Sequence, residues 1–248
     1  MESKRRTLMI AGGTDGIGFA LLRSEIQRSK YSKIFVVGRN FSKVDWDDTI
    51  SRQENHTIVK IPCDITQLDE IGRSLNSIGS EPVHDFVLTI GTFHRGKISD
   101  IMPTDVEENQ DDAKENDVVA DHFHLNCVST IHLIRYIVPR LVKGDSQILV
   151  CTASLALMAR SPYGLQGATK AALRSFTDTL RIELKGETRV MNLMPPSIDT
   201  EIFAKAGDLR DTHVYPPPSR ISKIIQYMLD CPPDICIPEM LVEQHRFN

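Results

Sequence analysis

The stretch that decides the fold is Ala11-Gly12-Gly13-Thr14-Asp15-Gly16-Ile17-Gly18. It stands between a short apolar run at 7–11 and a segment of helical apolar spacing at 17–26. A glycine-rich turn in this position lets backbone N–H groups approach a pyrophosphate, which then rests on the positive N-terminal end of the helix. Glycines alone would also fit a plain tight turn, but a strand before them and a helix after them make the motif specific. The stretch therefore predicts a dinucleotide-binding strand–turn–helix unit.

The rest of the chain repeats this alternation of strand and helix signals. Short β-branched or apolar runs that end at turn residues predict strands at 7–11, 33–37, 56–61, 86–90, 147–151 and 189–193. Apolar residues at helical spacing predict helices at 17–26, 118–142, 166–184 and 221–229, and a last apolar run covers 235–242. Strands alternating with helices predict an α/β fold with a doubly wound parallel sheet (Rossmann). We expect residues 1–248 to form one such domain.

Two segments interrupt the pattern. The segment 103–117 holds seven acidic residues against Lys114, which predicts a solvated acidic insertion. The segment 201–218 is long and irregular, ends in Pro216-Pro217-Pro218, and follows the sixth predicted strand. Segments of this kind often form mobile covers over a binding site, so we expect a substrate lid there.

Bulk properties exclude several classes of protein. The net charge of −4 gives no reason to expect a nucleic-acid partner. No apolar run approaches the ~18 residues that a membrane span needs, and the N-terminus shows no signal peptide. The five cysteines include no C-x-x-C pair, and His122 and His124, two apart, lie on different sides of a helix, so we expect no metal site. We expect a cytoplasmic protein with reduced thiols.

The motifs together resemble the short-chain dehydrogenase/reductase family. The family fingerprint T-G-x-x-x-G-x-G is matched with Ala11 in place of threonine, and Asp64 matches an aspartate near the adenine ring. Leu88-Thr89-Ile90-Gly91 stands where the family has N-N-A-G, Asn126 matches the helix asparagine, and 195–200 stands where the family has P-G-x-V-x-T. The resemblance implies a cofactor site made by Gly12, Thr14, Asp15, Gly16, Ile17, Gly18, Arg39, Asp64, Ile65, Gly91, Lys170, Ile198 and Thr200.

The end of the second predicted strand indicates which cofactor is bound. An acid there would bind the ribose 2′-hydroxyl of NAD, whereas a nearby arginine suits the 2′-phosphate of NADP. The sequence reads Gly38-Arg39 and has no acid before Asp45, which favours NADP. Asp15 argues the other way, because many NADP-preferring relatives carry a basic residue in the glycine loop. Arg39 as an ordinary surface charge remains the alternative.

The resemblance also implies a reaction site, and here the chain departs from the family. Family members use Ser, Tyr and Lys, the last two as Y-x-x-x-K on one face of a helix. Lys170 matches within Ala168-Thr169-Lys170-Ala171-Ala172-Leu173, but Gln166 stands in place of the tyrosine. A carboxamide can donate a hydrogen bond to a carbonyl oxygen and cannot release a proton.

Two further positions in this site stay open. Family spacing puts the serine at Ala153, so we favour the neighbouring Ser154, with Thr152 as a substitute and a simple strand-end cap as the alternative. Tyr163 is a phenol close to Gln166, and it reaches the pocket only if its loop folds inward. We therefore expect Ser154, Lys170, Asn126, Gln166 and Tyr163 to make up the catalytic site.

The prediction for function is an NADP(H)-dependent oxidoreductase of this family with a non-standard proton donor, either Tyr163 or a water near Lys170. The alternatives are a nucleotide-binding enzyme without redox chemistry, such as an isomerase or dehydratase, and a non-catalytic sensor or partner subunit. The substrate is a small molecule of unknown identity. The apolar segments 118–142 and 166–184 predict a homodimer or homotetramer, against the alternative that the sheet alone buries them.

Overall fold

The core of the molecule is organised around β1 (Arg6–Ala11), in which every residue after Arg6 is buried. A computed structural model of the chain describes residues 6–42, 57–101 and 117–245. Successive side chains of a strand point to opposite faces, so Leu8 and Ile10 pack into one apolar cluster while Met9 and Ala11 pack into another. Burial on both faces explains why this strand reads as a continuous apolar run.

The described residues form a seven-stranded sheet in the order β3-β2-β1-β4-β5-β6-β7, with every neighbouring pair parallel. The other strands are β2 (Tyr31–Gly38), β3 (Thr57–Pro62), β4 (Asp85–Leu88), β5 (Ser146–Cys151), β6 (Thr188–Met194) and β7 (Glu239–Leu241). The predicted α/β fold with a doubly wound parallel sheet is confirmed. The predicted strands are displaced by one or two residues at their ends, and the last apolar run yields only the short strand β7.

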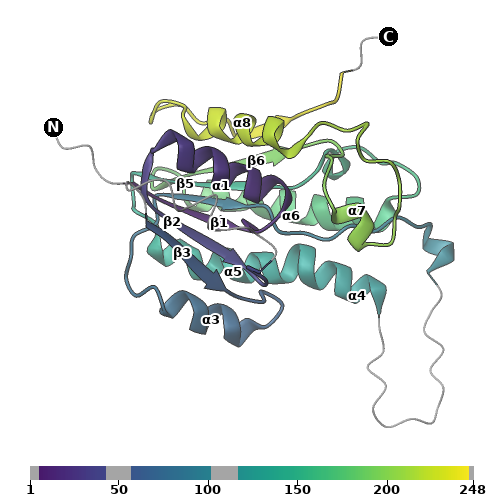
Figure 1. Cartoon of the computed structure of the whole chain (residues 1–248), viewed down its shortest axis with the longest axis horizontal. Coiled ribbons are helices and arrows are strands. Elements are labelled where there is room, and N and C mark those ends of the chain that lie inside the picture. Colours follow the sequence, from purple (N-terminus) through teal and green to yellow (C-terminus); the bar gives the residue numbers. More distant parts are fainter. Residues whose placement is uncertain (1–5, 43–56, 102–116, 246–248) are drawn as a thin grey trace, which may run out of the picture.

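Helices cover both faces of the sheet (Figure 1). One face is covered by α1 (Gly16–Arg28) and α8 (Pro218–Leu229), which supply Leu21, Leu22 and Ile225 to the same cluster as Leu8. The other face is covered by α3 (Leu68–Asn76), α5 (Thr130–Ile137) and α6 (Gly164–Glu183). Two shorter helices, α4 (Val118–Phe123) and α7 (Ile202–Lys205), lie near the ends of strands.

The helix predicted at 118–142 is divided into parts. Helix α4 continues through a π-helical turn, His124–Ser129, into α5, and a 3₁₀ turn, Val138–Arg140, closes the segment. Pro139 has no backbone N–H and explains the end. The π turn contains Asn126, and such turns are frequent at functional sites. Apolar spacing identified the helix but could not reveal the wider turn.

The two halves of the sheet meet between β1 and β4. The chain runs from β1 through β2 to β3 at one edge, and β4 then returns to pair with β1 on its other side. Ligands of open parallel sheets bind at the carboxyl ends of the strands where the order reverses in this way. The glycine turn leaves β1 at this point and Thr89–Gly91 leaves β4, so the topology places both loops at one crevice.

The structure describes one of the two irregular segments in full and only the last residue of the other. The acidic insertion at 103–117 and Asp45 lie outside the described residues, apart from Asp117, whose carboxylate accepts hydrogen bonds from the backbone N–H groups of Val119 and Ala120. The segment 201–218 contains α7 followed by irregular backbone. In the described part of the chain, no helix is both long and apolar enough to cross a membrane.

Candidate active site

The glycine turn forms an open cradle at the end of β1. Gly12 and Gly16 adopt positive φ angles of 91° and 52°, which side chains rarely tolerate. A Cβ added at Gly12 would lie 2.7 Å from Thr89 Oγ1, so the turn packs directly on the loop after β4. A Cβ at Gly18 would overlap the carbonyl group of Gly12, which shows that Gly18 supports the turn from behind.

The turn borders a pocket of about 250 Å³ at the crevice. Nine residues expected at the cofactor site line it: Gly12, Thr14, Asp15, Gly16, Ile17, Arg39, Asp64, Ile65 and Thr200. Gly91 lines it as well and also belongs to the neighbouring cavity, of which Ile198 and Lys170 are part. A glycine cradle, a helix N-terminus and a shallow slot between strand ends fit an extended dinucleotide.

Charge at the two ends of this pocket bears on the choice of nucleotide. Arg39 is exposed, and within the described residues no carboxylate pairs with its guanidinium. Asp15 caps α1 by accepting a hydrogen bond of 2.6 Å from the Gly16 backbone N–H, and it forms an ion pair with Lys205 of α7. The negative charge in the glycine loop is therefore matched by a cation that sequence analysis did not single out.

A larger cavity of about 690 Å³ adjoins the first and shares Ile17, Thr89, Ile90, Gly91, Thr200 and Ile202 with it. Ser154, Tyr163, Gln166 and Lys170, four of the five expected catalytic residues, line this cavity. Asn126, the fifth, is fully buried and does not line this cavity, and its Nδ2 contacts the His122 side chain. The shared wall means that a molecule in the second cavity would lie against a nucleotide in the first.

Lys170 is a buried cation at this wall. Its residue is only 5% exposed, and a Cβ added at Gly91 would lie 2.8 Å from Lys170 Nζ. The loop after β4 lacks the family's Asn-Asn-Ala but keeps its glycine, Gly91. Because Gly91 has no side chain, there is room for the Lys170 ammonium group. Burial lowers the pKa of Lys170 from 10.5 to about 8. The group can therefore exchange a proton near neutral pH.

Gln166, one turn before Lys170 on α6, contacts a histidine. Its Oε1 atom lies 2.8 Å from His122 Nε2, and both residues are 5% exposed. Burial lowers the pKa of His122 to about 4, so the imidazole is neutral at physiological pH. A neutral imidazole donates from one nitrogen only, and Gln166 Oε1 can only accept, so His122 Nε2 carries the proton in this pair.

Asn126 completes the network. Its Oδ1 accepts a hydrogen bond of 2.8 Å from the Thr92 backbone N–H, while its Nδ2 donates to the Thr92 carbonyl at 3.2 Å and to Thr169 Oγ1 at 3.3 Å. These partners use both protons of the amide group. Nδ2 also lies 2.9 Å from His122 Nε2, a contact that needs this ring nitrogen as acceptor and so competes with the hydrogen bond from His122 to Gln166 Oε1. The network fixes the Gln166 carbonyl and leaves the Gln166 NH₂ group for the cavity.

The structure distinguishes the two hydroxyl candidates. Thr152 Oγ1 donates to Asn192 Oδ1 at 2.8 Å and is thereby engaged between β5 and β6. Ser154 begins the 3₁₀ turn Ser154–Ala156, is partly exposed and lines the cavity. Thr152 lines the same cavity, but its hydroxyl is already engaged by Asn192, so the placement favours Ser154.

Tyr163 occupies the position just before α6 and also lines the cavity. Its phenol oxygen accepts a long hydrogen bond of 3.4 Å from Arg210 Nη2. The loop that carries Tyr163 therefore does fold towards the cavity. The phenol is directed to the segment after α7, whereas Gln166 is held by His122 on α4.

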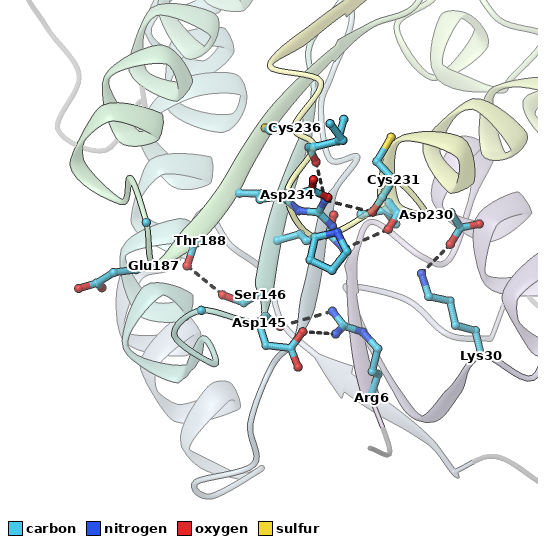
Figure 2. A pocket seen from close by; sticks show the side chains of 17 residues that line it. Arg6, Lys30, Asp145, Ser146, Glu187, Thr188, Asp230, Cys231, Asp234 and Cys236 are labelled. Atoms are coloured by element: carbon cyan, nitrogen blue, oxygen red, sulfur yellow. Dashed lines mark hydrogen bonds and ion pairs between the residues drawn. The ribbon is translucent and has the colours of Figure 1, made fainter. Parts of the chain in front are cut away.

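A separate cavity of about 460 Å³ lies at the opposite end of the sheet, beside the starts of β1, β5 and β6 (Figure 2). Its polar side chains are largely paired with one another. Lys30 Nζ lies 2.7 Å from Asp230 Oδ1, Arg6 Nη1 lies 2.5 Å from Asp145 Oδ1, and Ser146 Oγ lies 2.8 Å from Thr188 Oγ1 (Figure 2). The cavity lies away from the glycine turn, beside the amino-terminal ends of these strands.

Three residues of the site were not predicted: His122, Lys205 and Arg210. His122 had a usable signal, because it precedes Asn126 by four residues and so shares its helix face. Sequence analysis compared it with His124, which instead contacts the Thr66 carbonyl at 3.1 Å. Lys205 and Arg210 lie in a segment without periodic pattern, where only tertiary structure brings them to the cavities.

Comparison with known proteins agrees with this geometry. The family model described as short chain dehydrogenase matches residues 6–210. The uncharacterized oxidoreductase DltE of Bacillus subtilis is 24% identical over 210 residues, which cover 84% of this chain and 77% of that protein. An uncharacterized oxidoreductase of Listeria monocytogenes is 24% identical over 259 residues, covering 98% and 97% of the two chains.

Solved structures share the fold. The alcohol dehydrogenase of the archaeon Thermococcus sibiricus, complexed with 5-hydroxy-NADP, superposes with a TM-score of 0.80 at 16% identity, covering 98% of this chain and 100% of that one. A short chain dehydrogenase of Burkholderia cenocepacia in complex with NADP gives 0.75 at 18% identity, covering 98% and 90%. With the family model spanning most of its length, this chain belongs to the short-chain dehydrogenase family and is an oxidoreductase of that type.

Proposed function

We propose that the chain transfers a hydride between NADP(H) and a carbonyl or alcohol substrate, with Lys170 as proton donor and Gln166 as hydrogen-bond donor to the carbonyl oxygen. One observation carries the proposal: Lys170 and Gln166, both 5% exposed, line a single cavity that shares a wall with the dinucleotide pocket. A carbonyl in that cavity would meet both groups at the edge of the nucleotide site.

Arg39 supports NADP over NAD. Its guanidinium lines the pocket, has no carboxylate partner among the described residues, and offers a planar donor set for a 2′-phosphate. The negative charge of Asp15 argued against NADP. The ion pair between Asp15 and Lys205 reduces the repulsion between this charge and a phosphate. Two structural relatives hold NADP or 5-hydroxy-NADP, which is consistent with this choice.

Gln166 takes over one part of the family tyrosine's work. His122 Nε2–H donates to Gln166 Oε1, which turns the NH₂ group of the same amide towards the cavity. From there it can donate a hydrogen bond to a carbonyl oxygen and stabilise the negative charge that grows on this oxygen. His122 acts as a positioning residue, because it touches the amide and does not line the cavity.

Lys170 supplies the proton, which the amide of Gln166 cannot release. The bound reduced nicotinamide provides a hydride, so the carbonyl oxygen must receive its proton from elsewhere. A general acid works best when its pKa lies near the operating pH, and the lowered pKa of Lys170, about 8, meets that condition. Ser154 lines the same cavity and can donate a second hydrogen bond to the substrate oxygen.

We also infer that the protein assembles as a homodimer or homotetramer through the surface of α4, the π turn and α6. Val118, Val128 and Ile182 are large apolar residues on these elements, with exposures of 43%, 42% and 75%. Pairing of two copies would cover such residues. Light scattering at micromolar concentration is expected to give twice or four times the chain mass, and a monomer would contradict the inference.

The enzymatic proposal is tested by NADPH consumption with a panel of aldehydes and ketones. Lys170→Met should lower turnover on any active carbonyl by about 10²-fold or more, because it removes the acid while keeping an apolar filling for the buried site. Lys185→Met, which changes an exposed lysine just after the same helix, is the matched control and should behave like wild type. Undiminished turnover in Lys170→Met would overturn the assignment of the acid.

A further inference from the structure

Arg210 stands out among the residues that surround the larger cavity. It follows α7, its side chain is only 17% exposed, and it lines the cavity together with Gln166 and Lys170. Aromatic rings surround the guanidinium: Cζ lies 4.6 Å from the ring centre of Phe203, 5.2 Å from that of Phe93 and 5.9 Å from that of Tyr163. A cation that lies among aromatic rings in a cavity wall can bind an anionic group of a ligand, and the rings can pack on an apolar group beside it.

The guanidinium is only partly used by the protein. Nη2 pairs with Asp208, and the hydrogen bonds to Tyr163 Oη and Tyr215 Oη are long, at 3.4 Å each. Nε is buried and has no hydrogen-bond partner among the residues that the structure describes. A buried donor without an acceptor is unfavourable, so an acceptor that reached Nε would be bound favourably.

Asp208 does not cancel the positive charge inside the cavity. It contacts Arg210 from the side of a different surface hollow and is absent from the lining of the larger cavity. Asp208 also has a second cation, Arg95, whose Nη1 lies 3.8 Å away. The charged residues that line the cavity are Arg160, Lys170, Arg210 and Glu243, and both Arg160 and Glu243 are exposed. The interior therefore presents cations.

We propose that Arg210 binds a carboxylate of the substrate, so that the carbonyl compound handled by this enzyme is an oxo-acid with an apolar or aromatic body. A carboxylate can accept hydrogen bonds from the guanidinium nitrogens that Asp208 does not hold. The body of the substrate packs on Phe93 and Phe203.

This inference rests on the proposed function, and a matched pair of probes tests the two separately. The probes are 4-oxo-4-phenylbutanoate and its neutral amide, which share the ketone and the ring and differ in charge. Calorimetric titration into NADP⁺-loaded protein should show the acid binding at least about tenfold more tightly than the amide, as one charge-assisted hydrogen bond is worth. Turnover of each probe is followed in parallel by NADPH oxidation.

Two variants assign the preference to a residue. Arg210→Gln should bring the acid and the amide to equal affinity, while Arg95→Gln, which removes the other cation of Asp208 from outside the cavity, should keep the preference. A purely structural role for Arg210 would weaken both probes alike and leave their ratio unchanged. Should Arg210→Gln fail to fold, Arg210→Lys and the salt dependence of the wild-type preference replace it, since the preference must shrink in both.

The possible results separate the two claims. Equal binding of acid and amide by wild type, or a preference that survives Arg210→Gln, overturns the carboxylate site, and reduction of the amide would then still support the proposed oxidoreductase. A preference that depends on Arg210, with no reduction of either probe, supports the carboxylate site and counts against hydride transfer to such ketones.

Discussion

Replacing His122 with phenylalanine tests the structural reason why this site functions without a tyrosine. The imidazole donates a 2.8 Å hydrogen bond to Gln166 Oε1 within the buried network. Phenylalanine fills a similar volume and donates nothing, so the carbonyl oxygen of Gln166 is left buried and unpaired. The free energy of unfolding should fall by about 1–3 kcal/mol at neutral pH. Turnover should fall as well, because the Gln166 NH₂ group is no longer directed at the cavity.

The change of the free energy of unfolding with pH is a second quantity that this substitution should alter. The pKa of His122 is about 4 in the folded protein and 6.5 without the fold. Between these values the unfolded chain binds a proton that the folded chain does not, so His122 lowers stability as the pH falls from 6.5 to 4. At ~1.4 kcal/mol per unit the loss is at most about 3.5 kcal/mol. The phenylalanine variant should lack this component of the acid sensitivity.

Urea unfolding followed by circular dichroism, at neutral pH and at mildly acidic pH, measures both effects. His124→Phe is the matched control, because His124 lies two residues away, is exposed, and has its imidazole 3.1 Å from the Thr66 carbonyl and away from Gln166. Equal stabilities of the two variants at neutral pH, together with parallel acid profiles, would refute the role given to His122.

Three further predictions concern the cofactor, the acid and the missing phenol. Arg39→Ala should raise the dissociation constant of NADP(H) by about 10-fold or more while leaving that of NAD(H) unchanged, as titration of both nucleotides would show. For Lys170, whose pKa is about 8, kcat/KM for carbonyl reduction should decline above that pH, and kcat/KM for alcohol oxidation should rise through it, since the two directions need opposite protonation states. Gln166→Tyr should raise turnover by less than the ~10²-fold that a missing general acid would restore, because Lys170 already supplies the proton, and Tyr163→Phe should change turnover little; a collapse of turnover in Tyr163→Phe would make that phenol the acid.

The fold was predictable because its signals are local. The glycine turn after a buried strand, and the regular exchange of strand and helix patterns, require only neighbouring residues. Helix α3 was overlooked although Ile71 and Leu75 are buried on its inner face, because nine residues show few apolar repeats. The four residues of α7 are too short for any periodic signal.

The site was predictable only where a family motif marks it. Lys170 and Gln166 follow from spacing, Ser154 lies one residue from the position that the spacing gives, and the structure brings all three to one cavity. The partner of Gln166 did not follow, because His122 reaches it from α4 across 44 positions of sequence. The same holds for Lys205, which reaches Asp15 across 190 positions. Contacts of this kind depend on how helices pack, and a single sequence carries no direct signal for them.

The most direct test of the central claim follows the hydride itself. NADPH carrying deuterium at the transferable position of the nicotinamide is incubated with the protein and a panel of carbonyl compounds that includes 4-oxo-4-phenylbutanoate, and the products are analysed by mass spectrometry. We predict an alcohol that carries one deuterium on the former carbonyl carbon, formed by wild type and by Lys185→Met and strongly reduced with Lys170→Met. Bound NADPH with no deuterium in any product across the panel would contradict the account.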